Sequence, residues 1–299
     1  MKITVIGAGA MGLLFYQQLK GKNQVNLLSR GAKHLASTFS FTRLDNLSTL
    51  INLVHAQEID LLNSECVLCC VKSYDLPALI VKINAINPKL PIILMHNGMG
   101  VLEQTFKTHT IYNPIYTLLT TQASKKSAAW HIRHTGQGYN HLGNAFNPLD
   151  EQASQKLFNA FTTSLEHCEI DDNIRQKQWQ KLAINCAINA LTAIENVQNG
   201  ALAQTKYQPT IMAVIDELVL LANKENVCFD KDQLMTQVHQ VISLTAKNSS
   251  SMREDVLKGR KTEIDYINGY ISQLGQKHDC PTPINDLLTA KIRHLTKHA

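Results

Sequence analysis

The N-terminal segment constrains the fold of this chain more strongly than any other part of it. Residues 2–6 are apolar enough to form a buried strand, and they lead directly into the Gly-x-Gly-x-x-Gly motif Gly7-Ala8-Gly9-Ala10-Met11-Gly12. A helical pattern follows over 11–20, and a second apolar strand follows over 25–28. This order of strand, glycine turn, helix and strand is typical of a βαβ unit that binds a dinucleotide.

Each glycine has a separate use in such a unit. Gly7 allows a sharp turn off the strand, Gly9 leaves room for a pyrophosphate, and Gly12 lets the helix pack closely on the strand. The helix N-terminus then offers free N–H groups and the positive end of its dipole to the phosphates. A tight turn without a ligand is the alternative, but it explains one glycine and leaves the spacing of the other two unexplained.

The end of the second strand indicates which dinucleotide binds. Units that prefer NAD usually carry an acidic residue there, which binds the ribose 2′-hydroxyl. This chain instead has Ser29-Arg30, followed by Lys33. A guanidinium can bind a 2′-phosphate through two hydrogen bonds, whereas a carboxylate repels it. Arg30 therefore favours NADP(H), with a solvated loop arginine as the alternative.

The rest of the chain changes character near its middle. Strand and helix signals alternate at first, with strands expected at 66–71, 92–95, 110–120 and 129–142 and a helix at 76–86. Gly136 and Gly138 are expected as turn residues within these strand signals. Helical periodicity then dominates, at 151–166, 174–196, 208–225, 231–247 and 261–277. The pattern predicts an α/β Rossmann-type N-terminal domain that binds NADP, residues 1–168, and an all-α C-terminal substrate domain, residues 169–299.

Composition excludes several classes of protein. Of the 299 residues, 44% are hydrophobic and 18% are charged, as in globular proteins. No apolar run reaches the roughly 18 residues of a membrane helix, and the N-terminal strand lacks the features of a signal peptide. We therefore expect a cytoplasmic protein without a membrane partner. The net charge of +5 and 6% aromatic residues, without a recognisable motif, do not predict nucleic-acid binding.

The seven cysteines do not predict a redox or metal centre. Cys66-Val67-Leu68-Cys69 has C-x-x-C spacing, but it lies within an expected strand, whereas a redox pair normally begins a helix. There is no second cysteine pair that would complete a zinc site. Buried free thiols are favoured, and no metal is expected.

A polar stripe on an apolar helix is the second strong signal. Within 179–194 nearly every residue is apolar or small, and Lys181, Asn185 and Asn189 interrupt this pattern at i, i+4 and i+8. The three therefore share one face of the helix. Buried amides and ammonium groups are costly unless they are satisfied, so the stripe indicates a polar ligand. A hydrogen-bond network to a neighbouring helix is the alternative.

Further polar residues are candidates by their position. Lys72 and Asn97 follow expected strands, and open parallel sheets bind ligands at the carboxyl ends of their strands. Ser251 with Glu254 has the spacing of a capping box, which predicts the start of a helix that can also bind a carboxylate. Glu263 begins another helical pattern and can be an ordinary first-turn acid.

Taken together, these segments resemble the ketopantoate reductase (2-dehydropantoate 2-reductase) family. The resemblance runs through nearly the whole chain, and the matching stretches are Gly7–Gly12, Val71-Lys72, His96–Gly100, Thr121–Ala123, Trp179–Asn185, Asn189–Ala193, Asn199-Gly200, Ser250–Met252 and Thr262–Gly269. The helical Lys-Asn-Asn segment and the Thr-Glu-Ile-Asp-Tyr-Ile-Asn-Gly segment are far more specific than the glycine motif. Residues 36–65 match least.

The resemblance implies roles for individual residues. It makes Lys181 the proton donor and places Glu263 beside it in the catalytic set, near the nicotinamide ribose. It implies that the substrate is bound by Lys181, Asn185, Asn189, Asn199 and Ser251. It implies that NADPH is bound by Gly7, Ala8, Gly9, Ala10, Met11, Gly12, Arg30, Lys72, Asn97, Ala123 and Glu263.

The activity implied is reduction of 2-dehydropantoate to (R)-pantoate with NADPH, in pantothenate and coenzyme A biosynthesis. A related branched 2-oxo acid is an alternative substrate. A non-catalytic NADP(H)-binding sensor is a second alternative, although a sensor needs the glycine loop and not the polar helical residues. An opine-type or 6-phosphogluconate-type dehydrogenase is disfavoured by the same segments. The expected partner is a small 2-oxo acid, and the pattern also allows a homodimer.

Overall fold

The computed structural model describes residues 1–29 and 36–297, and the chain divides into two compact units. The first unit comprises Met1–His96 and Leu102–Ile174, and the second comprises Asn97–Val101 and Arg175–Ala299. The division after Ile174 lies later than the expected 168/169, because strand β11 (Cys168–Ile170) still pairs with the sheet of the first unit.

A seven-stranded sheet forms the centre of the first unit, in the order β11-β10-β7-β6-β5-β1-β2. Every neighbouring pair is parallel except β10 with β7. Strands β5 and β7 are buried at every position, as expected for parallel strands covered on both faces. The remaining bounds are β1 (Lys2–Ile6), β2 (Gln24–Leu28), β5 (Cys66–Cys69), β6 (Ile92–Leu94), β7 (Ile115–Thr120) and β10 (Asn140–Phe146). The predicted α/β class is confirmed.

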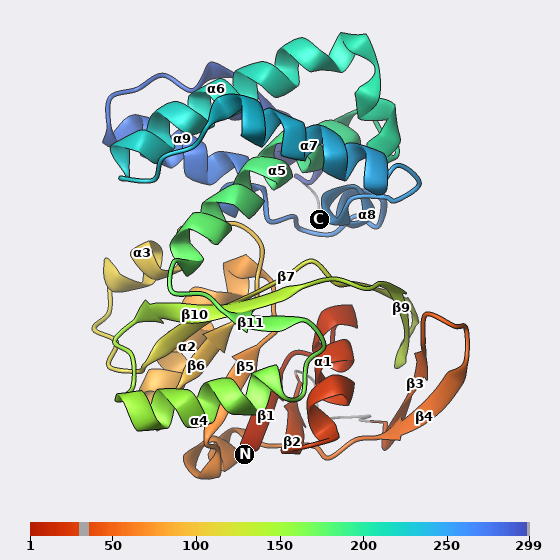
Figure 1. Ribbon diagram of the computed structural model, residues 1–299, viewed down its shortest axis with the longest axis vertical. Helices are drawn as coiled ribbons and strands as arrows, with labels where there is room; N and C mark the ends of the chain where they lie inside the picture. Colours follow the sequence, from red (N-terminus) through yellow and green to blue (C-terminus); the bar gives the residue numbers. More distant parts are fainter. Residues whose placement is uncertain (30–35, 298–299) are drawn as a thin grey trace. The chain divides into compact units, whose positions relative to one another are not determined.

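Helices cover both faces of this sheet. Helices α1 (Ala10–Lys20) and α4 (Glu151–Thr162) bury their apolar residues in one core with β1 and β5. Helix α2 (Leu76–Ile86) begins and ends where the pattern predicted and lies on the other side of the sheet from α4 (Figure 1). The shorter elements are α3 (Val101–Phe106) and the 3-10 turns η2 (Glu58–Asn63) and η3 (Ser73–Asp75).

A second sheet, which the sequence analysis did not predict, lies against α1. Its strand order is β4-β3-β9-β8, with bounds β3 (Thr38–Thr42), β4 (Ser48–Asn52), β8 (Ala123–Ala128) and β9 (His131–Gly136). The region 129–142 is divided at the glycines that were expected as turns, because β9 ends at Gly136 and β10 begins at Asn140 in the other sheet. Phe39 and Phe41 alternate with polar residues in β3 and are buried in the core that contains α1. This alternation was the available signal for a half-buried strand.

The second unit is helical, and no strand occurs across its described residues 175–297. Its long central helix α5 shares one apolar core with α6, α7, α9 and α10, which confirms the all-α prediction. Its elements are α5 (Ile174–Ile194), η4 (Asn199–Ala203), η5 (Thr205–Tyr207), α6 (Gln208–Lys224), α7 (Lys231–Leu244), α8 (Ser251–Leu257), η6 (Ile264–Tyr266), α9 (Asn268–Lys277) and α10 (Pro283–Leu295). The expected helix at 261–277 is broken, because Ile267 has non-helical dihedrals between η6 and α9.

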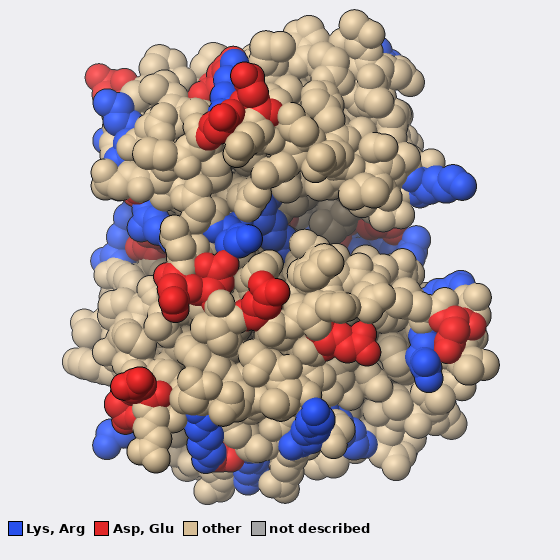
Figure 2. All heavy atoms as spheres, in the orientation of Figure 1, with Lys and Arg blue, Asp and Glu red and all other residues tan. Residues whose placement is uncertain are grey.

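The surface carries charges of both signs. On the face shown in Figure 2 most atoms belong to uncharged residues, and Lys and Arg lie close to Asp and Glu in several places. In the part of the chain that the structure describes, no helix has the length and apolar content to cross a membrane. The same residues contain no group of three or more His, Cys, Asp or Glu side chains that could hold a metal ion.

The cysteines are free thiols. Cys66 and Cys69 are buried in β5, where residues three apart point to opposite faces of the sheet. Burial raises the pKa of Cys66 and raises that of Cys69 to about 12. Thiols that stay protonated in an apolar sheet are poor nucleophiles.

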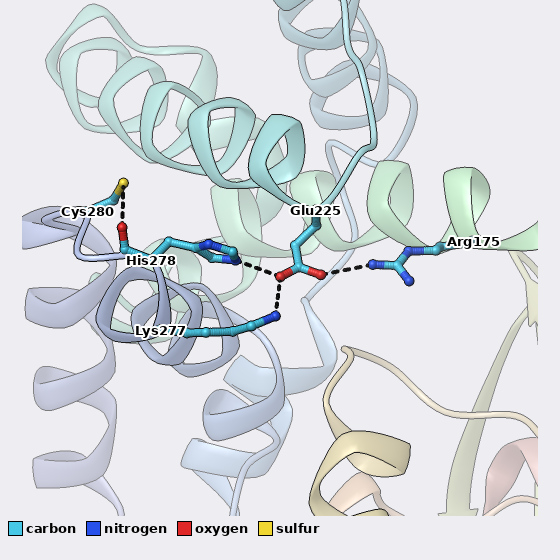
Figure 3. A network of polar contacts seen from close by, with 5 residues as sticks. All are labelled: Arg175, Glu225, Lys277, His278 and Cys280. Carbon is cyan, nitrogen blue, oxygen red and sulfur yellow. Dashed lines mark hydrogen bonds and ion pairs between the residues drawn. The ribbon is translucent and has the colours of Figure 1, made fainter.

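A cluster of charged residues ties three helices of the second unit together (Figure 3). One oxygen of Glu225, which follows α6, accepts hydrogen bonds from Lys277 Nζ at 2.6 Å and His278 Nε2 at 2.7 Å at the end of α9. The other oxygen accepts one from Arg175 Nη2 of α5 at 3.1 Å. Burial of the carboxyl opposes its ionisation, but the bonds from Lys277 and His278 outweigh it and lower the pKa of Glu225.

We expect Glu225→Gln to lower the free energy of unfolding by about 2 kcal/mol at pH 7, because the amide replaces a largely buried carboxylate that accepts charge-assisted hydrogen bonds from Lys277 and Arg175. A carboxyl with a lowered pKa stabilises the fold above its unfolded pKa, and this stabilisation disappears as the pH falls through the folded pKa. Urea unfolding at neutral and acid pH measures both effects. Glu58→Gln, which breaks an exposed ion pair with Lys82, is the control and should change little. An equal loss in the two variants would contradict the prediction.

Candidate functional site

The glycine turn after β1 is built so tightly that two of its positions exclude a side chain. Gly7 has φ +113°, and a Cβ there would lie 2.7 Å from the carbonyl oxygen of Cys70. A Cβ on Gly12 would lie only 1.9 Å from the carbonyl oxygen of Gly7. Helix α1 therefore begins directly against the end of β1, as the motif predicted.

Gly9 is different, because space is open around it. A Cβ at Gly9 would meet no atom of the described residues within 4 Å. Gly9 is the N-cap of α1, no side chain caps this end, and the first turn contains no acidic residue. The N–H groups of the first turn, from Ala10 and Met11 onward, thus face open space with a positive dipole end. This arrangement can hold a pyrophosphate.

The other predicted cofactor residues of the first unit lie near this turn or outside the described residues. Lys72 is the N-cap of η3, just after β5, and β5 neighbours β1, so Lys72 and the glycine turn share the carboxyl edge of the sheet. Ala123 opens β8. Ser29 Oγ, at the end of β2, is buried and has no hydrogen-bond partner among the described residues. Arg30 lies outside the described residues.

Asn97 meets Glu263, which is 166 positions later in the sequence. The segment Asn97–Val101 packs on η6, where the N–H of Met99 donates to the carbonyl oxygen of Tyr266 at 2.8 Å. Gly98 has φ +81°, and a Cβ there would lie 2.1 Å from the same oxygen. Asn97 Nδ2 then donates to Glu263 Oε2 across 3.5 Å. Two predicted cofactor-binding residues thus come together within the second unit.

Helix α5 carries the predicted polar stripe, and its lysine has an unusual pKa. Burial lowers the pKa of Lys181 to about 8, although the carboxylate of Glu263 acts in the opposite direction. Glu263 itself is buried, with 6% of its surface exposed. An ammonium whose pKa is close to neutral, held near a buried carboxylate, can both donate and recover a proton at physiological pH.

Several buried polar atoms around α5 have no hydrogen-bond partner among the described residues. They include Nδ2 of Asn185 and Oδ1 of Asn199. Asn199 Nδ2 donates to Thr245 Oγ1 at 2.9 Å, which holds the amide in place with its oxygen left open. Because buried polar groups in native proteins are nearly always satisfied, such atoms point to a polar ligand. This favours ligand binding over an internal network as the explanation of the stripe.

The sequence analysis missed two further atoms of this kind. Trp179 Nε1 and Thr262 Oγ1 are also buried without a partner among the described residues. Both residues begin stretches that were singled out, Trp179–Asn185 and Thr262–Gly269, but neither was named as a site residue. Their polar atoms sit on residues of largely apolar character, which is why the pattern did not mark them.

The predicted capping box at Ser251 is wrong by one residue. The N-cap of α8 is Ser250, whose Oγ accepts the N–H of Arg253 at 3.1 Å. Thr192 Oγ1 of α5 also donates to Ser250 Oγ at 2.7 Å. Ser251 is the first helical residue and is exposed. The capping residue is therefore Ser250. The hydroxyl of Ser251 is not the N-cap of α8.

Comparison with known proteins gives consistent results over the whole chain. The model of the family described as Ketopantoate reductase PanE/ApbA matches residues 3–147, and that of its C-terminal part matches residues 173–296. The 2-dehydropantoate 2-reductase of Vibrio cholerae serotype O1 is 36% identical over 310 aligned positions, which cover 99% of this chain and 98% of that protein.

Solved structures share the fold. A PanE/ApbA family ketopantoate reductase from Ralstonia eutropha has a TM-score of 0.87 at 24% identity and covers 99% of each chain. D-mandelate dehydrogenase, in a ternary structure with NADH and anilino(oxo)acetate, has a TM-score of 0.89 at 23% identity, also over 99% of each chain.

Proposed function

Because this chain belongs to the ketopantoate reductase family, a family of oxidoreductases, we propose that it reduces 2-dehydropantoate to (R)-pantoate with NADPH. The observation that carries the proposal is Lys181, whose lowered pKa and buried acidic neighbour Glu263 suit a proton donor. The amides of Asn185 and Asn199, which have open hydrogen-bonding atoms, supply the polar contacts that a hydroxylated oxo acid needs.

Each of these residues has a separate proposed role in the reduction of the ketone. A nicotinamide held by Asn97 and Glu263 would supply the hydride that forms a bond with the ketone carbon. As this bond forms, negative charge develops on the ketone oxygen, and the ammonium of Lys181 stabilises it and donates a proton to it. Lys181, left neutral, recovers a proton from solvent. Asn185, Asn189, Asn199 and Ser251 are proposed to orient the substrate, and Asn97 and Glu263 to bind the nicotinamide ribose.

The cofactor assignment rests on the glycine turn and on the sequence beyond it. The open N-terminus of α1 at Gly9 fits a pyrophosphate, and Gly7, Ala8, Ala10, Met11 and Gly12 complete that turn. We propose NADPH over NADH because Arg30 replaces the acidic residue that NAD-binding units carry, with Lys72 and Ala123 as further contacts. The same proposal places the protein in the cytoplasm and includes a homodimer as its assembly. Light scattering of the purified protein measures the number of subunits.

The direct test is NADPH oxidation, followed by absorbance, in purified protein with 2-dehydropantoate. We expect turnover that requires both compounds and is slower with NADH. A panel of other 2-oxo acids addresses the alternative of a related branched substrate, which the likeness to D-mandelate dehydrogenase also motivates. Tight NADPH binding without turnover of any 2-oxo acid would contradict the reductase and favour a sensor.

The pKa of Lys181 predicts the pH dependence. The donor acts in its protonated form, so kcat/KM should be constant below pH 8 and fall about tenfold per pH unit above it. Glu263→Gln removes the carboxylate that raises this pKa, so the falling limb should move to lower pH. Initial rates from pH 6 to 10 measure both profiles. An unchanged limb in Glu263→Gln would show that this carboxylate does not act on the donor.

A further inference from the structure

A lysine from the unpredicted second sheet reaches the glycine turn. Lys126, in β8, donates a hydrogen bond from Nζ to the carbonyl oxygen of Ala8 at 3.3 Å, although 118 positions separate the two residues. The same Nζ lies 5.8 Å from the ring centroid of Trp130, within the range of a cation–π contact. Lys126 is exposed, so its ammonium remains accessible to an anion.

The pairing of β8 explains why Lys126, and not its neighbour, points to this turn. Lys126 pairs with Ile132 of β9, and Ile132 pairs with Phe41 of β3. Directly paired residues project to the same face of a sheet, and Ile132 and Phe41 are buried in the core that contains α1. Lys125 pairs with Arg133, which is exposed, so it projects to the opposite face.

The Nζ atom of Lys126 lies near the carboxyl end of β1, and the carboxyl end of β2 is next to it in the sheet. The N–H of Gly7, the residue before Ala8, donates to the carbonyl oxygen of Leu28 at 2.9 Å, and from Leu28 the chain continues into the residue that follows β2. That residue is Ser29, whose buried Oγ has no partner among the described residues. In βαβ dinucleotide sites, the carboxyl end of the second strand is the place where the ribose 2′ position is recognised.

We propose that Lys126 is a specificity-determining residue that binds the 2′-phosphate of the dinucleotide. The proposal rests on the proposed NADPH-binding function and adds to it a cation supplied by a separate sheet. On binding, the ammonium exchanges the neutral carbonyl of Ala8 for a phosphate oxygen. A charge-assisted hydrogen bond of this kind is stronger than one to a backbone carbonyl.

The experiment measures dissociation constants of NADPH and NADH, by cofactor fluorescence, for the full-length protein and two variants. Lys126→Met should weaken NADPH binding about tenfold and leave NADH binding within about twofold of wild type. Lys125→Met, on the opposite face of the same strand, should leave both constants unchanged. Lys126→Arg should restore NADPH binding, because a guanidinium also binds phosphate.

Other outcomes separate the possible failures. Equal weakening of NADPH and NADH by Lys126→Met would overturn the proposal and indicate a pyrophosphate contact or a disturbed glycine turn, which a lowered melting temperature would identify. Unchanged NADPH binding in Lys126→Met would also overturn it while leaving the proposed function intact. If the wild-type protein bound neither cofactor, the proposed function itself would fail.

Discussion

Lys181→Met is expected to lower kcat at least a hundredfold while the dissociation constant of NADPH stays close to wild type. A preorganised donor at a developing oxyanion typically contributes two to three orders of magnitude to the rate, on the order of 3 kcal/mol. Lys181 projects from a helix of the second unit, whereas the proposed phosphate contacts lie in the first. Loss of the ammonium should therefore affect the chemical step and spare most of cofactor binding.

A loss of activity through unfolding can be told apart from this effect. Burial lowers the pKa of Lys181, which means that the folded state disfavours the charged side chain. Replacing it by methionine, of similar length and without charge, should leave the free energy of unfolding at pH 7 unchanged or raise it by on the order of 1 kcal/mol.

Steady-state kinetics and urea unfolding of the same preparation measure both quantities. Lys224→Met, at the exposed end of α6, is the matched control and should retain wild-type kcat. Substantial turnover in Lys181→Met would remove this residue from the role of proton donor.

Gly12→Ala and Gly9→Ala are expected to fail in different ways. At Gly12 an added Cβ would lie 1.9 Å from the backbone oxygen of Gly7, and backbone at this buried junction cannot move aside cheaply. We expect a loss of about 3 kcal/mol of stability or failure to fold. At Gly9 the added Cβ meets no atom within 4 Å in the part of the chain that the structure describes, so the fold should be retained. The methyl group would instead occupy space that the pyrophosphate needs.

Thermal unfolding and NADPH titration of the two variants measure this difference. Gly9→Ala should melt near the wild-type temperature and bind NADPH at least tenfold more weakly. Gly21→Ala is the control for both measurements. Its Cβ also meets no atom within 4 Å among residues 1–29 and 36–297, but Gly21 follows the far end of α1. NADPH binding at wild-type strength in Gly9→Ala would place the phosphates elsewhere.

Short-range patterns in the sequence were sufficient to predict much of this protein. The glycine turn, helix α2 and the helix that carries Lys181 were predicted because hydrophobic periodicity and backbone sterics act over a few residues. The stripe of Lys181, Asn185 and Asn189 follows from the helical repeat alone. These features depend on neighbours within about one or two turns, and those neighbours are visible in the sequence.

Other features depend on which distant segments pack together, and no local pattern encodes that. The sheet β4-β3-β9-β8 combines segments around residues 40 and 130, so its strands gain their burial only from tertiary packing. The approach of Asn97 to Glu263 and the lowered pKa of Lys181 arise in the same way, from packing of the helical unit. The N-cap of α8 is Ser250, and the hydroxyl of Ser250 also accepts a hydrogen bond from Thr192 of α5. Hydrogen bonds and desolvation act at a few ångströms in space, whatever the separation along the chain, so these properties become visible only in the folded structure.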